Sequence, residues 1–104
     1  MDTLSRLEAT IVERLGASPE ESYVAHLHSR GLKVVARKLG EEATEAVVAA
    51  LSGSNEELVG EAADVLFHLL VLLAEKGIPL SEVLAELERR EGTSGLVEKA
   101  SRGK

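Results

Sequence analysis

Polar side chains lie at equal sequence distances on either side of Gly53, which separates two long apolar segments. Three pairs stand 8, 11 and 15 residues from this glycine. If two antiparallel helices turn at Gly53, each pair lies at one level, and four carboxylates face one another across a helical hairpin. The pairs are Glu45 with Glu61, Glu42 with Asp64, and Lys38 with His68.

The rest of the chain also has the periodicity of helices, and no segment has a convincing strand pattern. The expected helices span about residues 4–15, 18–30, 32–51, 54–76 and 79–91. The sequence therefore predicts one all-α domain, residues 1–104, built as an antiparallel helical bundle around the central hairpin. The polar and basic segment from about 92 to 104 is expected to be a mobile tail.

Start signals precede several of these helices. Ser18-Pro19-Glu20-Glu21 combines an N-cap residue, proline and glutamate, and it predicts that the second helix begins there. Ser54-x-x-Glu57 predicts a capping box for the fourth helix. For the first helix, either Ser5-x-x-Glu8 or Thr3 could supply the cap.

The fourth helix is apolar almost all round between residues 65 and 74. Such a helix is buried on more than one side, and a chain of 104 residues has few helices to cover it. A homodimer that pools its helices is the favoured solution. The alternative is a monomer in which the first and last helices cover the far side.

Composition excludes several classes of function. The net charge of −6 argues against a nucleic-acid partner, and the absence of cysteine excludes disulfides and thiolate metal sites. The apolar run at 65–74 is too short to cross a membrane, and no signal segment is visible at the N-terminus. We therefore expect a soluble, cytoplasmic protein without a membrane partner.

The spacing of the acids favours a site for a hard cation. Glu42 and Glu45 are three residues apart on one helix face, and Glu61 and Asp64 repeat that spacing. Carboxylates on apolar helices are costly unless their charge is paired, and one lysine and one histidine cannot neutralise four of them. Oxygen ligands alone indicate Mg²⁺, with Mn²⁺ also possible. The alternative is that these acids simply face water.

A Mg²⁺ site of this kind suits phosphoryl chemistry, because the ion neutralises a polyphosphate and activates water for attack. Lys38 and Arg37 are candidates for contacts to phosphate oxygens, as is Lys33. Glu41 is either a base beside the metal ligands or a solvent-facing acid. His68 is either part of the site or a hydrogen-bonded core histidine.

Two segments carry a resemblance to a known family. They are Lys38-Leu39-Gly40-Glu41-Glu42-Ala43-Thr44-Glu45 and Glu61-Ala62-Ala63-Asp64-Val65-Leu66-Phe67-His68. With Ser22-Tyr23-Val24 and the segment 95–102, they resemble the phosphoribosyl-ATP pyrophosphohydrolases, within the all-α NTP pyrophosphohydrolase superfamily. The superfamily signature Glu-Glu-x-x-Glu, a spacer and Glu-x-x-Asp is matched by Glu41, Glu42, Glu45, Glu61 and Asp64.

The resemblance implies a helical homodimer that hydrolyses phosphoribosyl-ATP to phosphoribosyl-AMP and pyrophosphate with Mg²⁺, in histidine biosynthesis. It implies that Glu42, Glu45, Glu61 and Asp64 are metal ligands. It also implies that Glu41 is either a base or a residue behind the metal ligands, and that Lys38 contacts a phosphate. Tyr23 and His68 are further candidates for contacts to the substrate. One departure is Phe67, where many relatives have tyrosine. Without cysteine, the chain is expected to be the form that stands alone rather than the one fused to a zinc-dependent cyclohydrolase.

Two other functions stay open at this stage. The same site could serve a hydrolase that removes canonical or damaged nucleoside triphosphates. A non-catalytic dimerisation module, with its acids in water, would belong to a different class. Arg89, Arg90, Lys99 and Arg102 are further candidates for holding the ribose phosphate, although basic residues at a surface are usually only solvated.

Overall fold

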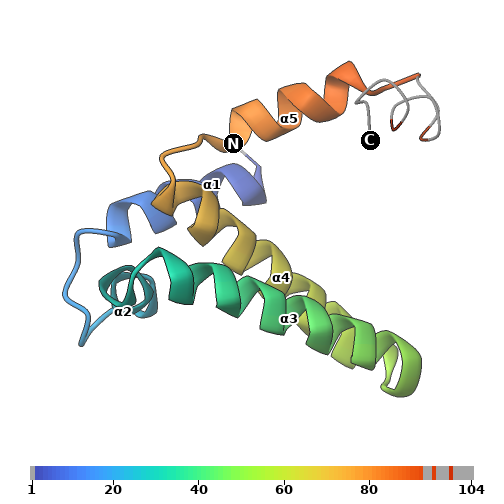
Figure 1. The fold of residues 1–104 in the computed structure, drawn as a ribbon, viewed down its shortest axis with the longest axis horizontal. Helices are drawn as coiled ribbons and strands as arrows, with labels where there is room; N and C mark the ends of the chain where they lie inside the picture. The colour runs from blue at the N-terminus through green and yellow to red at the C-terminus, as the bar shows by residue number, and fades with distance from the viewer. Residues whose placement is uncertain (1, 93–94, 96–98, 100–104) are drawn as a thin grey trace.

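The computed structural model describes residues 2–92, 95 and 99, and it shows five α-helices and no strand between residues 2 and 92 (Figure 1). The helices are α1 (Thr3–Arg14), α2 (Tyr23–Arg30), α3 (Leu32–Ser52), α4 (Asn55–Glu75) and α5 (Leu80–Arg89). The all-α prediction is therefore confirmed. The expected mobile tail lies almost wholly outside the described residues. No described helix is long and apolar enough to span a bilayer.

Neither cap expected for the first helix is used. Asp2 is the N-cap of α1, and its carboxylate accepts a hydrogen bond of 2.8 Å from the Ser5 amide. Glu8 instead reaches α5, where its Oε2 accepts a hydrogen bond of 2.7 Å from the Leu80 amide. The prediction of a local capping box was wrong because Glu8 satisfies a helix start 72 residues away along the chain.

The second helix begins at Tyr23, not at Ser18 as predicted. The Ser18 carbonyl accepts from the amides of Glu21 and Ser22 at 3.0 and 3.1 Å, so the start signal produces a single turn. Ser22 then adopts an extended backbone, with φ −139° and ψ 126°, and interrupts the helix. Its hydroxyl accepts from the Ala25 amide at 3.2 Å and caps α2.

The turn between α3 and α4 contains the predicted capping box. The Glu57 amide donates to Ser54 Oγ at 3.1 Å, and the Ser54 amide donates to Glu57 Oε1 at 2.7 Å. Gly53 is required here for space rather than for a left-handed backbone, since its φ is −107°. A Cβ on Gly53 would lie 2.8 Å from Glu57 Oε1 and 3.0 Å from the Ala49 carbonyl oxygen.

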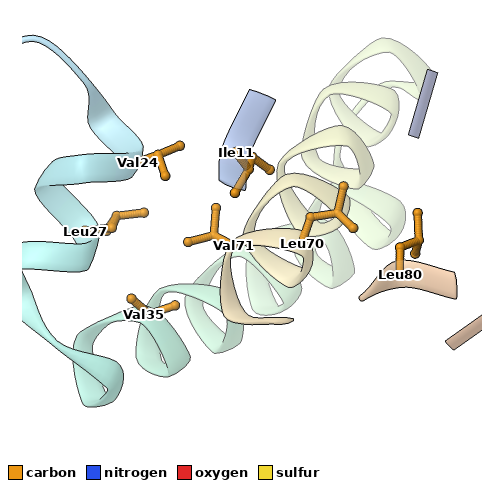
Figure 2. Packing of buried hydrophobic residues seen from close by; sticks show 7 residues of the cluster. All are labelled: Ile11, Val24, Leu27, Val35, Leu70, Val71 and Leu80. Atoms are coloured by element: carbon orange, nitrogen blue, oxygen red, sulfur yellow. The ribbon is translucent and has the colours of Figure 1, made fainter. Parts of the chain in front are cut away.

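From this turn, α3 and α4 lie side by side and form the most extensive helix contact among the described residues (Figure 1). The core lies where the C-terminal half of α4 meets α1, α2 and the start of α3. Val71 at its centre is completely buried. Figure 2 shows the side chains of this cluster, which are Ile11, Val24, Leu27, Val35, Leu70, Val71 and Leu80.

The halves of α3 and α4 that adjoin the turn extend away from this core, with no other described helix beside them (Figure 1). Their exposed surface is apolar in part, with Val47 58%, Leu51 83% and Val59 70% exposed. The radius of gyration is 15.7 Å, whereas a compact domain of this length has about 13 Å. A single chain therefore leaves much of the apolar surface of α3 and α4 in water.

Candidate metal centre between α3 and α4

Three carboxylates converge on the contact between the two long helices. Glu42 and Glu45 project from α3 and Glu61 from α4, and one oxygen of each lies within 4.8 Å of the other two. Glu42 is buried and Glu61 half-buried, while Glu45 is exposed. The i, i+3 spacing on α3 and the packing of α4 alongside place these three charges on one face.

Of the three carboxylates, Glu61 is the one with a buried oxygen, Oε1, that lacks a hydrogen-bond partner. Burial raises the pKa of the Glu61 carboxyl, and the neighbouring charges of Glu45, Asp64 and Glu42 raise it further. A buried oxygen that faces other carboxylates is unfavourable without a positive charge.

The donor set fits a hard divalent cation. All three candidate ligands offer carboxylate oxygen, which Mg²⁺ and Mn²⁺ prefer, and no nitrogen or sulfur ligand belongs to the group. The unpartnered oxygen of Glu61 is the observation in the structure that points to an ion. These residues therefore fit the metal that the acid spacing predicted.

Asp64 lies beside this group rather than within it. Its side chain is exposed on α4, and its oxygens do not complete the close set of three. It is nevertheless near enough to contribute to the raised pKa of Glu61. The four acids predicted as a set are thus on one side of the helix pair, with three in immediate proximity.

The basic residues of α3 lie at the edge of the acid group. The Lys38 ammonium is 3.6 Å from Glu41 Oε1 and 3.7 Å from Glu42 Oε2. Arg37 Nε is 3.6 Å from the other oxygen of Glu41. Glu41 therefore lies between two cations, whereas Glu42 connects Lys38 to the other two converging carboxylates, those of Glu45 and Glu61.

His68 is 5% exposed and is fully hydrogen-bonded. Its Nδ1 lies 2.7 Å from the carbonyl oxygen of Asp64, and its Nε2 lies 2.9 Å from the Tyr23 hydroxyl. The Tyr23 ring stacks on Phe67, with centroids 6.0 Å apart, and meets the His68 ring edge-on at 5.7 Å. The sequence left the environment of His68 open, and the structure places it under Tyr23.

Tyr23 and Lys38 influence each other electrostatically. Burial raises the pKa of the Tyr23 hydroxyl, while the charge of Lys38 opposes this rise. The pKa of Lys38 is raised, with Tyr23 as the largest cause and Glu41 and Glu42 as further ones. Lys38 and His68 are each 15 residues from Gly53, so the helix pair brings Lys38 level with the histidine that is hydrogen-bonded to Tyr23.

A cavity of about 330 Å³ lies next to the acids, on the side of the turn. Glu45 and Glu61 form one end, and Val48 and Ala49 form an apolar wall. A group held at the carboxylates can therefore extend along α3 and α4 toward Gly53.

Sequence reasoning missed one contact between residues far apart in the chain and two local ones on α5. His28 Nδ1 lies 2.8 Å from Glu75 Oε1 and connects α2 to α4. Arg89 and Arg90, considered as phosphate contacts, both donate to Glu86 at the end of α5. No periodic signal marks the contact of His28 with Glu75, whereas Glu86 with Arg89 and Arg90 has the i, i+3 and i, i+4 spacing of a helix and could have been predicted.

Comparison with known proteins agrees with the resemblance seen in the sequence. Residues 4–91 match the family model of phosphoribosyl-ATP pyrophosphohydrolase. The chain is 65% identical over 103 residues to the phosphoribosyl-ATP pyrophosphatase of Erythrobacter litoralis, covering 99% of both chains. It is 62% identical to the protein of that name from Novosphingobium aromaticivorans, covering 97% of this chain and 94% of the relative. The chain therefore belongs to the phosphoribosyl-ATP pyrophosphohydrolase family.

Proposed function

We propose that this protein hydrolyses phosphoribosyl-ATP to phosphoribosyl-AMP and pyrophosphate, in the second step of histidine biosynthesis. Membership of the family and the shared name of its relatives support this substrate. The observation that carries the chemistry is the unpartnered Glu61 oxygen beside the carboxylates of Glu42 and Glu45. Three converging carboxylates outnumber the one lysine ammonium that pairs with them, which suits a substrate that arrives with a cation.

In this proposal Glu42, Glu45, Glu61 and Asp64 hold Mg²⁺, and Mn²⁺ can replace it. When bound, the ion would neutralise polyphosphate charge and activate water for attack on phosphorus. Glu42 is oriented by the Lys38 ammonium at 3.7 Å, and the i, i+3 spacing holds Glu45 beside it. Asp64 completes the set from the exposed side of α4.

The groups at the edge of the acids would act on the substrate itself. Lys38 and Arg37 are placed to neutralise phosphate oxygens that the metal does not reach. Glu41, held between these two cations, is the candidate base that accepts a proton from the attacking water. Tyr23 and His68, hydrogen-bonded to each other at 2.9 Å, would support these groups from the start of α2 and from α4.

We further propose that α3 and α4 form a helical hairpin at the centre of a homodimer, as one domain of residues 1–104 in the cytoplasm. The exposed apolar side chains of Val47, Leu51 and Val59 support this assembly, because a second copy would remove them from water. The extended radius of gyration of one chain supports it as well.

The experiment is to measure pyrophosphate release from phosphoribosyl-ATP with and without Mg²⁺, with ATP and dUTP as comparison substrates. We expect fast release from phosphoribosyl-ATP only, and only with Mg²⁺. Glu42→Gln and Asp64→Asn should each lower kcat at least a hundredfold, while Glu13→Gln, an exposed acid on α1, should not. Release from ATP and dUTP alone would instead favour a general nucleotide hydrolase. Full activity of Glu42→Gln would contradict the site.

A further inference from the structure

The hydrogen bonds of His68 determine where the proton of the Tyr23 hydroxyl lies. A backbone carbonyl oxygen only accepts, so the 2.7 Å bond between His68 Nδ1 and the Asp64 oxygen requires a proton on Nδ1. In a neutral imidazole the other nitrogen is then an acceptor. In that neutral form the Tyr23 hydroxyl, 2.9 Å from Nε2, donates its only proton to His68.

This arrangement leaves the Tyr23 oxygen as an acceptor toward the acid group. Tyr23 is 47% exposed, whereas His68 is buried beneath it, so the phenol oxygen is the part of the pair that can meet other groups. A phenol oxygen without a free proton cannot donate to a phosphate oxygen. Its next partner must itself be a donor.

Lys38 is a donor at the same level of the helix pair, because Lys38 on α3 and the Tyr23-bonded His68 on α4 are each 15 residues from Gly53. Its ammonium pairs with Glu41 and Glu42 at 3.6 and 3.7 Å, which are long distances for charged hydrogen bonds. If the Glu42 carboxylate is engaged by a cation, Lys38 loses one of these two partners. The Tyr23 oxygen is then a neutral acceptor that can hold the ammonium without adding negative charge.

The ring contacts restrict where the phenol can move. Phe67 lies 6.0 Å from the Tyr23 ring in a stacked arrangement and 5.1 Å from the His68 ring at 86°. Because three rings pack together, the direction of the hydroxyl is set by His68 rather than by free rotation of Tyr23.

We propose that His68 is a positioning residue that fixes the Tyr23 hydroxyl as an acceptor, and that Tyr23 in turn holds the Lys38 ammonium over the acid group, toward the substrate phosphates. His68 thus acts through Tyr23 and does not contact the substrate, unlike the expectation from the sequence. This deepens the proposed function and rests on it for the identity of the substrate.

The first test is the tautomer of His68, read by long-range ¹⁵N–¹H NMR of the native protein at pH 8. We expect the Nδ1–H tautomer. The Nε2–H tautomer would overturn the proposal, because Tyr23 would then accept from His68 and keep its own proton for the substrate. This measurement does not depend on turnover, so it also decides the hydrogen-bond direction in a protein that fails to hydrolyse phosphoribosyl-ATP.

The second test is kinetic. Tyr23→Phe should lower kcat/KM for phosphoribosyl-ATP about fivefold to tenfold, the scale of one lost hydrogen bond. His68→Leu should have a similar effect alone and little further effect in the Tyr23→Phe background. His68→Gln, whose amide oxygen can accept from Tyr23, should recover most of the loss. Additive effects of Tyr23→Phe and His68→Leu would overturn the proposal.

The third test addresses Lys38 with a double-mutant cycle of Tyr23→Phe and Lys38→Met. Coupling in kcat/KM is expected, with the double variant no worse than Lys38→Met alone. The same four proteins, compared by thermal unfolding with Mg²⁺, give a coupling that needs no turnover. If neither quantity shows coupling, Tyr23 does not hold Lys38. If coupling appears only in unfolding, the contact has no role in the reaction and the proposal fails.

Discussion

Gly53→Ala adds only one methyl group, but it is expected to destabilise the turn between α3 and α4 substantially. The added Cβ would lie 2.8 Å from Glu57 Oε1, 3.0 Å from the Ala49 carbonyl oxygen and 3.3 Å from the Ala49 Cα. The first of these atoms accepts the capping bond from Ser54, and the second accepts from the Gly53 amide at 2.9 Å. One methyl group therefore meets both interactions that close the turn.

The expected cost can be worked from these contacts. The Glu57 carboxylate can rotate away, which loses half of the capping box and costs about 1 kcal/mol. The Ala49 carbonyl belongs to the backbone and can be relieved only by a shift of the helix end. The two effects together give about 1–3 kcal/mol, within the usual range for a single substitution. For a domain of this size, that lowers Tm by roughly 5–20 °C.

Thermal unfolding at one fixed protein concentration measures this effect. The matched control is Gly60→Ala in α4, where an added Cβ has open space and should stabilise the helix by up to about 1 kcal/mol. In a Glu57→Ala background the cost of Gly53→Ala should fall, because the closest clash is already removed. An unchanged Tm for Gly53→Ala, or the same cost in both backgrounds, would refute this reasoning.

Three further predictions concern the acid group and the start of α5. Mg²⁺ at 100 times its Kd should stabilise the folded protein by about 2.7 kcal/mol, and Glu61→Gln should abolish that rise in Tm while Glu13→Gln should not. Because the folded state raises the pKa of Glu61, the metal-free protein should lose stability as pH rises through that pKa; Tm against pH should show this loss in the wild type and a smaller one in Glu61→Gln. Glu8→Ala removes the cap of Leu80 and should cost about 1 kcal/mol, whereas Glu8→Gln keeps an acceptor and should cost less; equal losses of Tm in both variants would show that the cap contributes nothing.

The sequence predicted the elements whose signals are local. The capping box of Ser54 and Glu57 formed because both partners lie within one helical turn. The glycines Gly31 and Gly77 end their helices with φ of 94° and 71°, which few other residues adopt. The apolar periodicity gave the extents of α3 and α4 to within a residue or two. Each of these predictions depends on neighbours along the chain.

The errors arose where a second local signal or a tertiary contact competes with the expected local one. Ser18 and Glu21 form one turn, but Ser22 caps a second helix start only four residues later, and the two signals cannot share one helix. Glu8 has a plausible local partner in Ser5, yet it binds the backbone of Leu80. A local sequence window around Glu8 contains Ser5 but not Leu80, so it holds no information on the contact made in the folded chain.

The symmetry of the acids about Gly53 does not extend to their environments. Glu42 is 7% exposed and faces Lys38, so its burial is partly offset by a cation of the same helix. Its mirror partner Asp64 is exposed and is solvated. Glu61 has neither advantage, since its Oε1 is shielded from water and its nearest charges are negative. We therefore expect the first cation to be held mainly by Glu61, Glu45 and Glu42. Asp64 is expected to join the ligands once that cation has neutralised the negative charge of these three carboxylates. Equal spacing along the sequence set which residues meet, while the local packing of each side chain determines how strongly each requires the ion.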